Sequence, residues 1–164
     1  MTFPLKLNLG AGIDIRRPDF LNVDIQCFPG IDLISDARDL FVIEDSSMEF
    51  IVAQHILEYI PREDMLLSVF EWKRLLKDNG ILEIRCTDLS QLTKALYLNN
   101  ISTEMGMHDE MVVALVYGQQ INKYDIRYNG FTSSFLQGVL RACGFRIINN
   151  VIEGLDFILS AQKK

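Results

Sequence analysis

Strand-like and helix-like segments alternate through most of this chain, and that alternation constrains the fold more than any other feature of the sequence. Short apolar runs predict five strands, at residues 5–9, 20–25, 31–34, 48–53 and 81–86. Apolar residues recur at helical spacing in four further segments, at residues 61–77, 89–98, 109–117 and 132–143. Strands that alternate with helices favour a parallel, doubly wound sheet.

The last two apolar runs predict a hairpin. Residues 145–152 and 156–161 are joined by Glu153-Gly154-Leu155, and the pair would add one antiparallel strand. The expected fold class is therefore α/β, with a Rossmann-like, doubly wound, mostly parallel seven-stranded sheet and an antiparallel C-terminal strand. No linker or repeat divides the chain, so residues 1–164 are expected to form a single domain.

Residues that are typical of helix starts and helix ends occur on either side of the apolar pattern at 61–77. Pro61 suits a helix start, and Glu63 and Asp64 in a first turn would oppose the positive end of the helix dipole. Basic residues up to Lys77 would occupy the last turns, and Asn79-Gly80 would end the helix. Residues 99–131 carry weaker patterns, and their organisation stays open at this stage.

Charge and composition exclude several classes of partner. Residues 1–60 hold 4 basic and 10 acidic side chains, whereas the rest of the chain holds 12 of each, so the whole net charge of −6 lies in the first 60 residues. An acidic chain without a basic cluster argues against duplex nucleic acid as a partner. The longest apolar stretch, residues 111–117, is too short to span a membrane.

Cysteine usage and the absence of targeting signals predict a cytoplasmic location. The three cysteines are odd in number and form no C-x-x-C pair, and the N-terminus lacks the pattern of a secretion signal. His108 has no second histidine at a ligand spacing, so no metal site is expected. The oligomeric state stays open, with a homodimer among the alternatives.

The turn after the first strand contains Gly10-Ala11-Gly12. Glycines at a strand tip let the backbone approach a ligand closely, and ligands of doubly wound sheets bind at such tips. A dinucleotide fingerprint would need a third glycine where this chain has Ile15, with a helix directly after it. Residues 13–19 have the composition of a loop instead, which disfavours a nicotinamide-dependent oxidoreductase.

Two acids end the next two strands. Asp24 is placed to accept hydrogen bonds from both hydroxyls of a ribose, and Asp36 to accept one from the exocyclic amine of a purine. Either acid alone is more typical of a strand-end cap or a turn. A glycine turn and two acids at three successive strand tips together indicate a nucleoside site.

Six stretches share the order and spacing of a known family: LNLGAG (7–12), NVDI (22–25), SDARDL (35–40), MEFIVAQHILEYIP (48–61), EWKRLLKDNGILEIRCTDL (71–89) and GFTSSFLQGVLRACGF (130–145). They resemble the class I S-adenosylmethionine-dependent methyltransferases, especially the short, type-11-like members. The resemblance spans nearly the whole chain and implies a single methyltransferase-like domain over residues 1–164.

The resemblance implies S-adenosylmethionine as the cofactor. The implied cofactor-binding residues are Leu9, Gly10, Ala11, Gly12, Asp24, Ile25, Asp36, Ala37, Gln54 and His55. The glycine turn would lie under the methionine part, Asp24 would hold the ribose, and Ile25 would pack on the adenine. Asp36 and Ala37 would meet the adenine edge, and Gln54 and His55 would face the sulfonium.

The sequence defines the residues that would bind the methyl acceptor less well than those that would bind the cofactor. The candidate substrate residues are Asp88, which would border the acceptor cleft, and Tyr124, Arg127 and Tyr128, which an ordinary polar loop would explain almost as well. The family often has a histidine where this chain has Tyr59, and the short members often have one at Arg127. His55 is the candidate catalytic base by position and ordinary pKa, although a histidine that packs on the cofactor without transferring a proton is the slightly favoured alternative.

These observations favour an S-adenosylmethionine-dependent methyltransferase that acts on a small molecule, for which the resemblance suggests a sugar or glycan precursor. The alternative is a non-catalytic, methyltransferase-like binding module or partner subunit.

Overall fold

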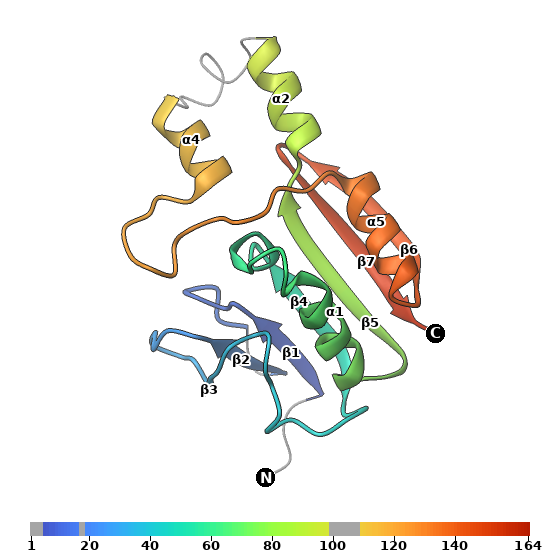
Figure 1. The fold of residues 1–164 in the computed structure, drawn as a ribbon. Helices are drawn as coiled ribbons and strands as arrows, with labels where there is room; N and C mark the ends of the chain where they lie inside the picture. The colour runs from blue at the N-terminus through green and yellow to red at the C-terminus, as the bar shows by residue number, and fades with distance from the viewer. Residues whose placement is uncertain (1–4, 17–18, 99–108) are drawn as a thin grey trace.

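A seven-stranded sheet forms the centre of the molecule, as the sequence predicts (Figure 1). The computed structural model describes residues 5–16, 19–98 and 109–164. The strands are β1 (Lys6–Leu9), β2 (Phe20–Asp24), β3 (Leu33–Ile34), β4 (Met48–Gln54), β5 (Leu76–Thr87), β6 (Phe145–Glu153) and β7 (Asp156–Lys163). They lie in the order β3-β2-β1-β4-β5-β7-β6.

Strand directions confirm the expected fold class. The first five strands pair in parallel, whereas β7 lies between β5 and β6 and is antiparallel to both. The predicted C-terminal hairpin is thus present, with Gly154 in its turn at φ +61°. The chain leaves β3 at one edge and returns to β4 beside β1, so the strand order reverses there. Ligands of doubly wound sheets bind at this kind of reversal.

The helices are α1 (Met65–Leu75), α2 (Leu89–Tyr97), α4 (Asp109–Tyr117) and α5 (Ser133–Ala142), with a 3₁₀ turn, η1, at Leu57–Tyr59. In Figure 1, α1 and α5 lie on one face of the sheet, and α2 and α4 lie beyond the carboxyl end of β5. None of the described helices has the length and apolar character needed to span a membrane.

The core lies between the sheet and the pair α1 and α5. Leucines and isoleucines of β1, β4, β5 and β7 meet apolar side chains of the two helices, among them Leu7, Ile51, Leu82, Leu159, Val69, Trp72, Leu136 and Leu140. Along β5 these buried residues alternate with half-buried Ile81, Glu83 and Arg85. That alternation is typical of a sheet with only one face in the core.

The described part of residues 13–19 is a loop, as predicted.

The helix predicted over 61–77 is shorter at both ends. Pro61 to Asp64 form a turn in which the Asp64 amide donates to the Pro61 carbonyl, so Glu63 and Asp64 precede α1 rather than fill its first turn. At the other end, Leu76 is extended with ψ 137° and begins β5. Its fully buried side chain belongs to the core, and this tertiary contact overrides the helical pattern.

Side-chain caps begin two of the helices. Thr132 accepts a hydrogen bond from the Phe135 amide at the start of α5, and Asp88 accepts one from the Ser90 amide at the start of α2. Such caps satisfy amides that have no partner within the helix.

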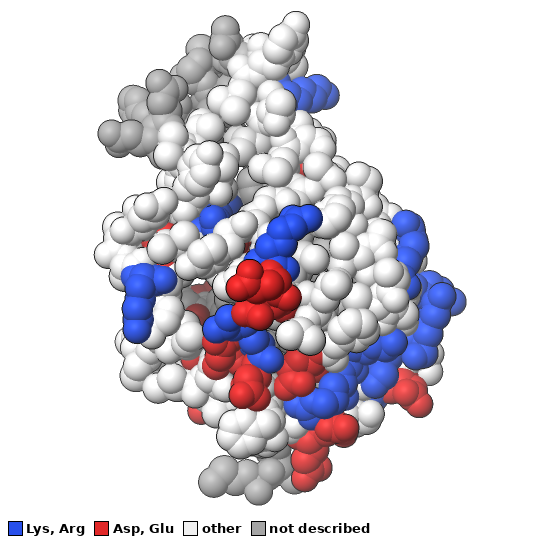
Figure 2. All heavy atoms as spheres, in the orientation of Figure 1, with Lys and Arg blue, Asp and Glu red and all other residues white. Residues whose placement is uncertain are grey.

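Figure 2 shows acidic and basic side chains intermixed over the region around α1.

Trp72 links the core to the turn after β3. Its side chain is fully buried, and its indole N–H donates to the Ala37 carbonyl over 2.8 Å. We expect Trp72→Phe to lower the free energy of unfolding by about 1–3 kcal/mol, because a buried carbonyl loses its donor and a void remains. Urea denaturation measures this change. The matched control is Phe70→Ala on the exposed side of α1, which should stay within about 0.5 kcal/mol of the unmodified protein. Equal losses in both variants would contradict this role for Trp72.

Candidate functional site

A cavity of about 530 Å³ opens at the carboxyl ends of β1 to β4. This volume lies within the usual range for small-molecule sites. Each of the four strands contributes residues to its wall: Gly10 and Gly12 after β1, Asp24 and Ile25 at the end of β2, Asp36 and Ala37 after β3, and His55 after β4. Seven of the ten predicted cofactor-binding residues therefore line one cavity.

The glycine turn forms the floor at the end of β1. Gly10 and Gly12 have φ values of +63° and +50°, in the left-handed region that side chains with a Cβ rarely adopt. A Cβ at Gly10 would lie 2.8 Å from Ile56 Cδ1, whereas a Cβ at Gly12 would meet nothing within 4 Å. Gly10 is therefore required both because a Cβ would clash with Ile56 and because its φ is left-handed. Gly12 is required only because of its left-handed φ.

Asp24 is a nearly buried carboxylate at the tip of β2. One oxygen accepts a hydrogen bond from the Gly12 amide and the other accepts one from the Gln26 amide, each over 2.8 Å. These bonds hold the carboxylate in one orientation at the cavity wall. A carboxylate has about four acceptor positions, so both oxygens retain capacity for ligand hydroxyls.

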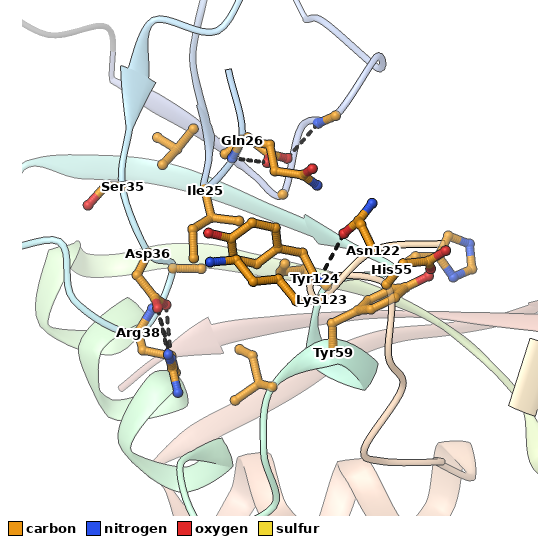
Figure 3. A pocket seen from close by; sticks show the side chains of 18 of the residues that line it. Ile25, Gln26, Ser35, Asp36, Arg38, His55, Tyr59, Asn122, Lys123 and Tyr124 are labelled. Atoms are coloured by element: carbon orange, nitrogen blue, oxygen red, sulfur yellow. Dashed lines mark hydrogen bonds and ion pairs between the residues drawn. The ribbon is translucent and has the colours of Figure 1, made fainter. Parts of the chain in front are cut away.

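Asp36 is held by a cation from its own turn. Arg38 donates to both oxygens of Asp36 through Nε and Nη2, and its Nη1 reaches Asp64 over 2.6 Å. Figure 3 shows this pair at one end of the cavity. Side-chain hydrogen bonds from Arg38 lower the pKa of Asp36. The predicted contact of Asp36 with a purine amine would therefore be made by a carboxylate already paired with arginine.

His55 lies between two carboxylates. Its Nδ1 is 3.3 Å from Glu58 Oε1, and its Nε2 is 3.3 Å from Asp156 Oδ2, which also accepts from Arg85 Nε over 2.8 Å. The hydrogen bonds to Asp156 and Glu58 raise the pKa of His55 to about 9. An imidazole protonated at neutral pH has no free lone pair to accept a proton. This geometry favours a positioning role for His55 over base catalysis.

The loop after α4 supplies the remaining wall. Asn122, Lys123, Tyr124 and Tyr128 line the cavity opposite the strand tips. Figure 3 shows Tyr124 and Lys123 in the middle of the view, between Asp36 at one end and His55 at the other. Two of the predicted substrate residues, Tyr124 and Tyr128, thus reach the same cavity as the predicted cofactor residues.

Other predicted residues lie elsewhere. Leu9 at the end of β1 and Ala11 in the turn are buried and do not line the cavity. Gln54 also lies outside the lining, because its side-chain oxygen accepts a hydrogen bond from Arg16 Nη2 over 2.9 Å. Asp88 is buried as the cap of α2, so its carboxylate serves a helix rather than the cavity.

Arg127 lines a neighbouring, smaller cavity rather than the large one. Its guanidinium lies over the ring of Tyr59, which faces the large cavity. His108 lies outside the described residues.

Sequence reasoning missed several residues of the cavity wall. Gln26, Phe28, Ser35, Arg38 and Ile56 adjoin the predicted strand-tip residues, so a wider window around each tip would have included them. Apart from Tyr124, which the family resemblance suggested, no sequence signal placed residues 121–125 there, because a loop without periodicity does not show what it folds against.

The overall structure resembles solved methyltransferases. The chain superposes on a methyltransferase dependent on S-adenosylmethionine from Methanosarcina mazei with a TM-score of 0.65 at 19% identity, covering 99% of this chain and 93% of that one. A methyltransferase of the same class from Archaeoglobus fulgidus gives 0.66 at 13% identity, with coverage of 96% and 85%.

A third similar structure was solved with ligands. It is the 1,6-didemethyltoxoflavin-N1-methyltransferase of Burkholderia thailandensis with bound 1,6-didemethyltoxoflavin and S-adenosylhomocysteine, with a TM-score of 0.64 at 15% identity and coverage of 97% and 70%. No protein-family model matches this chain, and no curated protein matches it significantly. The solved structures show that the chain has the class I methyltransferase fold.

The two glycines make a matched pair for mutation. We expect Gly10→Ala to destabilise the protein by about 2–4 kcal/mol, from left-handed strain and from the clash with Ile56. Gly12→Ala should cost only about 1–2 kcal/mol, because strain acts alone. Unfolding in urea measures both variants. Adding Ile56→Ala should offset part of the Gly10→Ala loss, and strictly additive losses would argue against the clash.

The ion pairs of His55 predict a pH-dependent stability. The pKa of His55 is higher in the folded protein, so its contribution is complete below the unfolded value of about 6.5 and disappears as the pH rises through about 9. We expect His55→Asn to destabilise the protein by about 1–2 kcal/mol at pH 6, allowing for partial solvent screening, and by much less at pH 10. Asparagine tolerates the φ of +49° at this position, which separates charge from backbone strain. A stability difference that does not change with pH would contradict the ion-pair role.

Proposed function

We propose that this chain, which has the class I methyltransferase fold, binds S-adenosylmethionine in the large cavity and transfers its methyl group to a small molecule. The observation that carries this proposal is the oriented carboxylate of Asp24 beside the left-handed glycine turn. A nucleoside ligand needs an acceptor for two neighbouring ribose hydroxyls, and a floor without side chains where the backbone approaches the ligand. The residues present fit both needs.

The described residues suggest how the cofactor would be held. Asp24 would accept the ribose hydroxyls, and exposed Ile25 offers an apolar surface to the adenine ring. Asp36, Ala37, Gly10 and Gly12 line the same cavity, where the first two would meet the adenine edge and the two glycines would lie under the methionine part. When bound, the cofactor supplies a methyl group on a positively charged sulfur, which is already a good leaving group.

Alignment would be the main contribution of the protein to the reaction. Methyl transfer is an in-line displacement, and precise positioning of the two reactants can contribute about 7–11 kcal/mol. His55, fixed between Glu58 and Asp156, would hold the wall near the reacting atoms rather than move a proton. Tyr124 and Tyr128 would help to enclose the site and exclude water. For the acceptor we propose a small molecule with a sugar or glycan precursor as the first class to test.

Calorimetric titration with S-adenosylhomocysteine tests the cofactor assignment. We expect saturable binding to the unmodified protein and at least a tenfold weaker affinity for Asp24→Ala, because charge-assisted hydrogen bonds to two hydroxyls are lost. Asp39→Ala removes an exposed acid that does not line the cavity and is the matched control, with unchanged affinity expected. NAD should give no binding heat. Failure of the unmodified protein to bind S-adenosylhomocysteine, or equal affinities for Asp24→Ala and Asp39→Ala, would overturn the assignment.

A labelled methyl donor tests catalysis separately. The protein, the donor and fractions of small molecules that include sugars and glycan precursors are incubated together, and label in a new product is measured. We expect transfer by the unmodified protein and at least tenfold less by Asp24→Ala at subsaturating donor. Tight binding of S-adenosylhomocysteine without transfer to any fraction would favour the non-catalytic binding module instead.

A further inference from the structure

A second cavity, of about 210 Å³, lies next to the proposed cofactor site. Tyr128 belongs to the walls of both cavities, and Arg127 of the smaller one stacks on Tyr59 of the larger one. The two cavities therefore share part of a wall. The small cavity is below the usual size range for a complete small-molecule site, so it suits one end of a ligand that extends from the large cavity.

The wall of the small cavity is apolar on one side. Leu89 from α2 and Leu115 and Val116 from α4 supply aliphatic surface. The other side carries polar residues from three segments, namely Glu58 of η1, Thr87 of β5 and the stretch 127–129. A cavity with aliphatic walls and a few converging polar groups is typical of a site that orients a ligand.

Glu58 is a buried carboxylate with one oxygen in use. Its Oε1 accepts from the Thr87 amide over 3.1 Å and faces His55 Nδ1, while its own carbonyl accepts from the Tyr128 and Asn129 amides. Only 1% of the residue is exposed. Oε2 accepts no hydrogen bond from an N–H or O–H group of the described residues, and the neighbouring thiol of buried Cys86 is only a weak donor to this carboxylate. Since a buried acceptor without a donor is costly, this oxygen calls for a donor from a ligand.

Asn129 also has one side-chain polar atom with a hydrogen-bond partner and one without. Its side-chain NH₂ donates to the Ile60 carbonyl, but its Oδ1 accepts nothing from the part of the chain that the structure describes. Arg127, a strong donor in the same wall, is already engaged, because its Nη1 donates to Thr87 Oγ1 and to the Leu115 carbonyl. Two residues of this wall thus offer acceptors, and the guanidinium donor Arg127 Nη1 of the same wall is engaged elsewhere.

The charges around Glu58 indicate which kind of hydrogen-bond donor on a ligand would suit this carboxylate. Arg127 Nη1 lies 3.9 Å from Oε1, and His55 lies 3.3 Å from the same oxygen on its other side. Two basic side chains already offset the carboxylate, so a further full positive charge would gain little here. A neutral N–H or O–H group on a small apolar body matches this wall better than an ammonium.

We infer that the small cavity is the methyl-acceptor pocket, and that it recognises a neutral hydrogen-bond donor of the acceptor through Glu58 and Asn129. This inference rests on the proposed function for its role in methyl transfer. The recognition itself depends only on the cavity. The same two residues would then distinguish acceptors with a free N–H or O–H group from analogues in which that group is replaced by an acceptor.

Two ring compounds of equal size provide the probe. Pyrrole carries a neutral N–H donor, whereas furan has an oxygen in the same position and no donor. Each is titrated into the full chain without cofactor, and the methyl signals of Leu89, Leu115 and Val116 are followed by NMR. We expect pyrrole to shift these signals saturably and to bind at least tenfold more tightly than furan. Protonated pyrrolidine, an ammonium of similar size, should also bind at least tenfold more weakly than pyrrole.

Glu58→Gln tests the residue directly. The variant keeps one side-chain oxygen and places an NH₂ donor beside it, so the preference for pyrrole over furan should fall at least tenfold or reverse. Glu63→Gln makes the same chemical change at an exposed position outside both cavities and should leave the preference intact. If Glu58→Gln does not fold, Leu115→Phe replaces it, since filling the cavity should weaken the binding of both probes.

Several results would overturn the inference. These are equal binding of pyrrole and furan, tighter binding of pyrrolidinium, shifts that do not map to the cavity, and an unchanged preference in Glu58→Gln. An unchanged affinity in Leu115→Phe would do the same. A clear pyrrole preference in a protein that does not bind S-adenosylhomocysteine would instead refute the proposed function, and with it the role of this pocket in methyl transfer.

Discussion

The buried Glu58 carboxylate connects the segments from which both cavities are built. Its Oε1 receives the Thr87 amide at the end of β5 and meets His55 after β4, and its backbone carbonyl receives the amides of Tyr128 and Asn129. One residue of a 3₁₀ turn therefore holds together the tips of two strands and the loop that encloses the site. Removing its charge would leave two basic side chains without their shared partner, which is costly in a buried environment.

The arrangement around His55 shows how the surroundings of a residue predicted to be catalytic can disfavour the expected proton transfer. The position after β4 and the ordinary pKa of histidine predict a base. The carboxylates of Asp156 and Glu58 bracket the ring and raise its pKa to about 9, so the imidazole acts as a cation that links β4 to β7. Asp156 comes from the far end of the chain, and only the folded sheet brings it beside His55.

Much of the fold could be predicted from local patterns. The strands, the C-terminal hairpin and the helix at Asp109–Tyr117 follow from apolar periodicity and turn residues. The bounds of α1 could not, because Leu76 continues the helical pattern but is buried in the core as the first residue of β5. The candidate site was likewise only partly predictable. Residues at the strand tips could be identified from their place after each apolar run. Asp88 could not be excluded in this way, because only the structure shows its carboxylate capping α2.

The sequence by itself determined the alternation of strands and helices, the left-handed glycine turn and the acids at the strand tips, because each depends on neighbours in the chain. Only the tertiary structure decided which partners those side chains have. It joined Arg38, the partner of Asp36, to the distant Asp64, bound Gln54 to Arg16, and placed residues 121–125 over the cavity. These outcomes depend on contacts between distant segments, which local spacing does not encode.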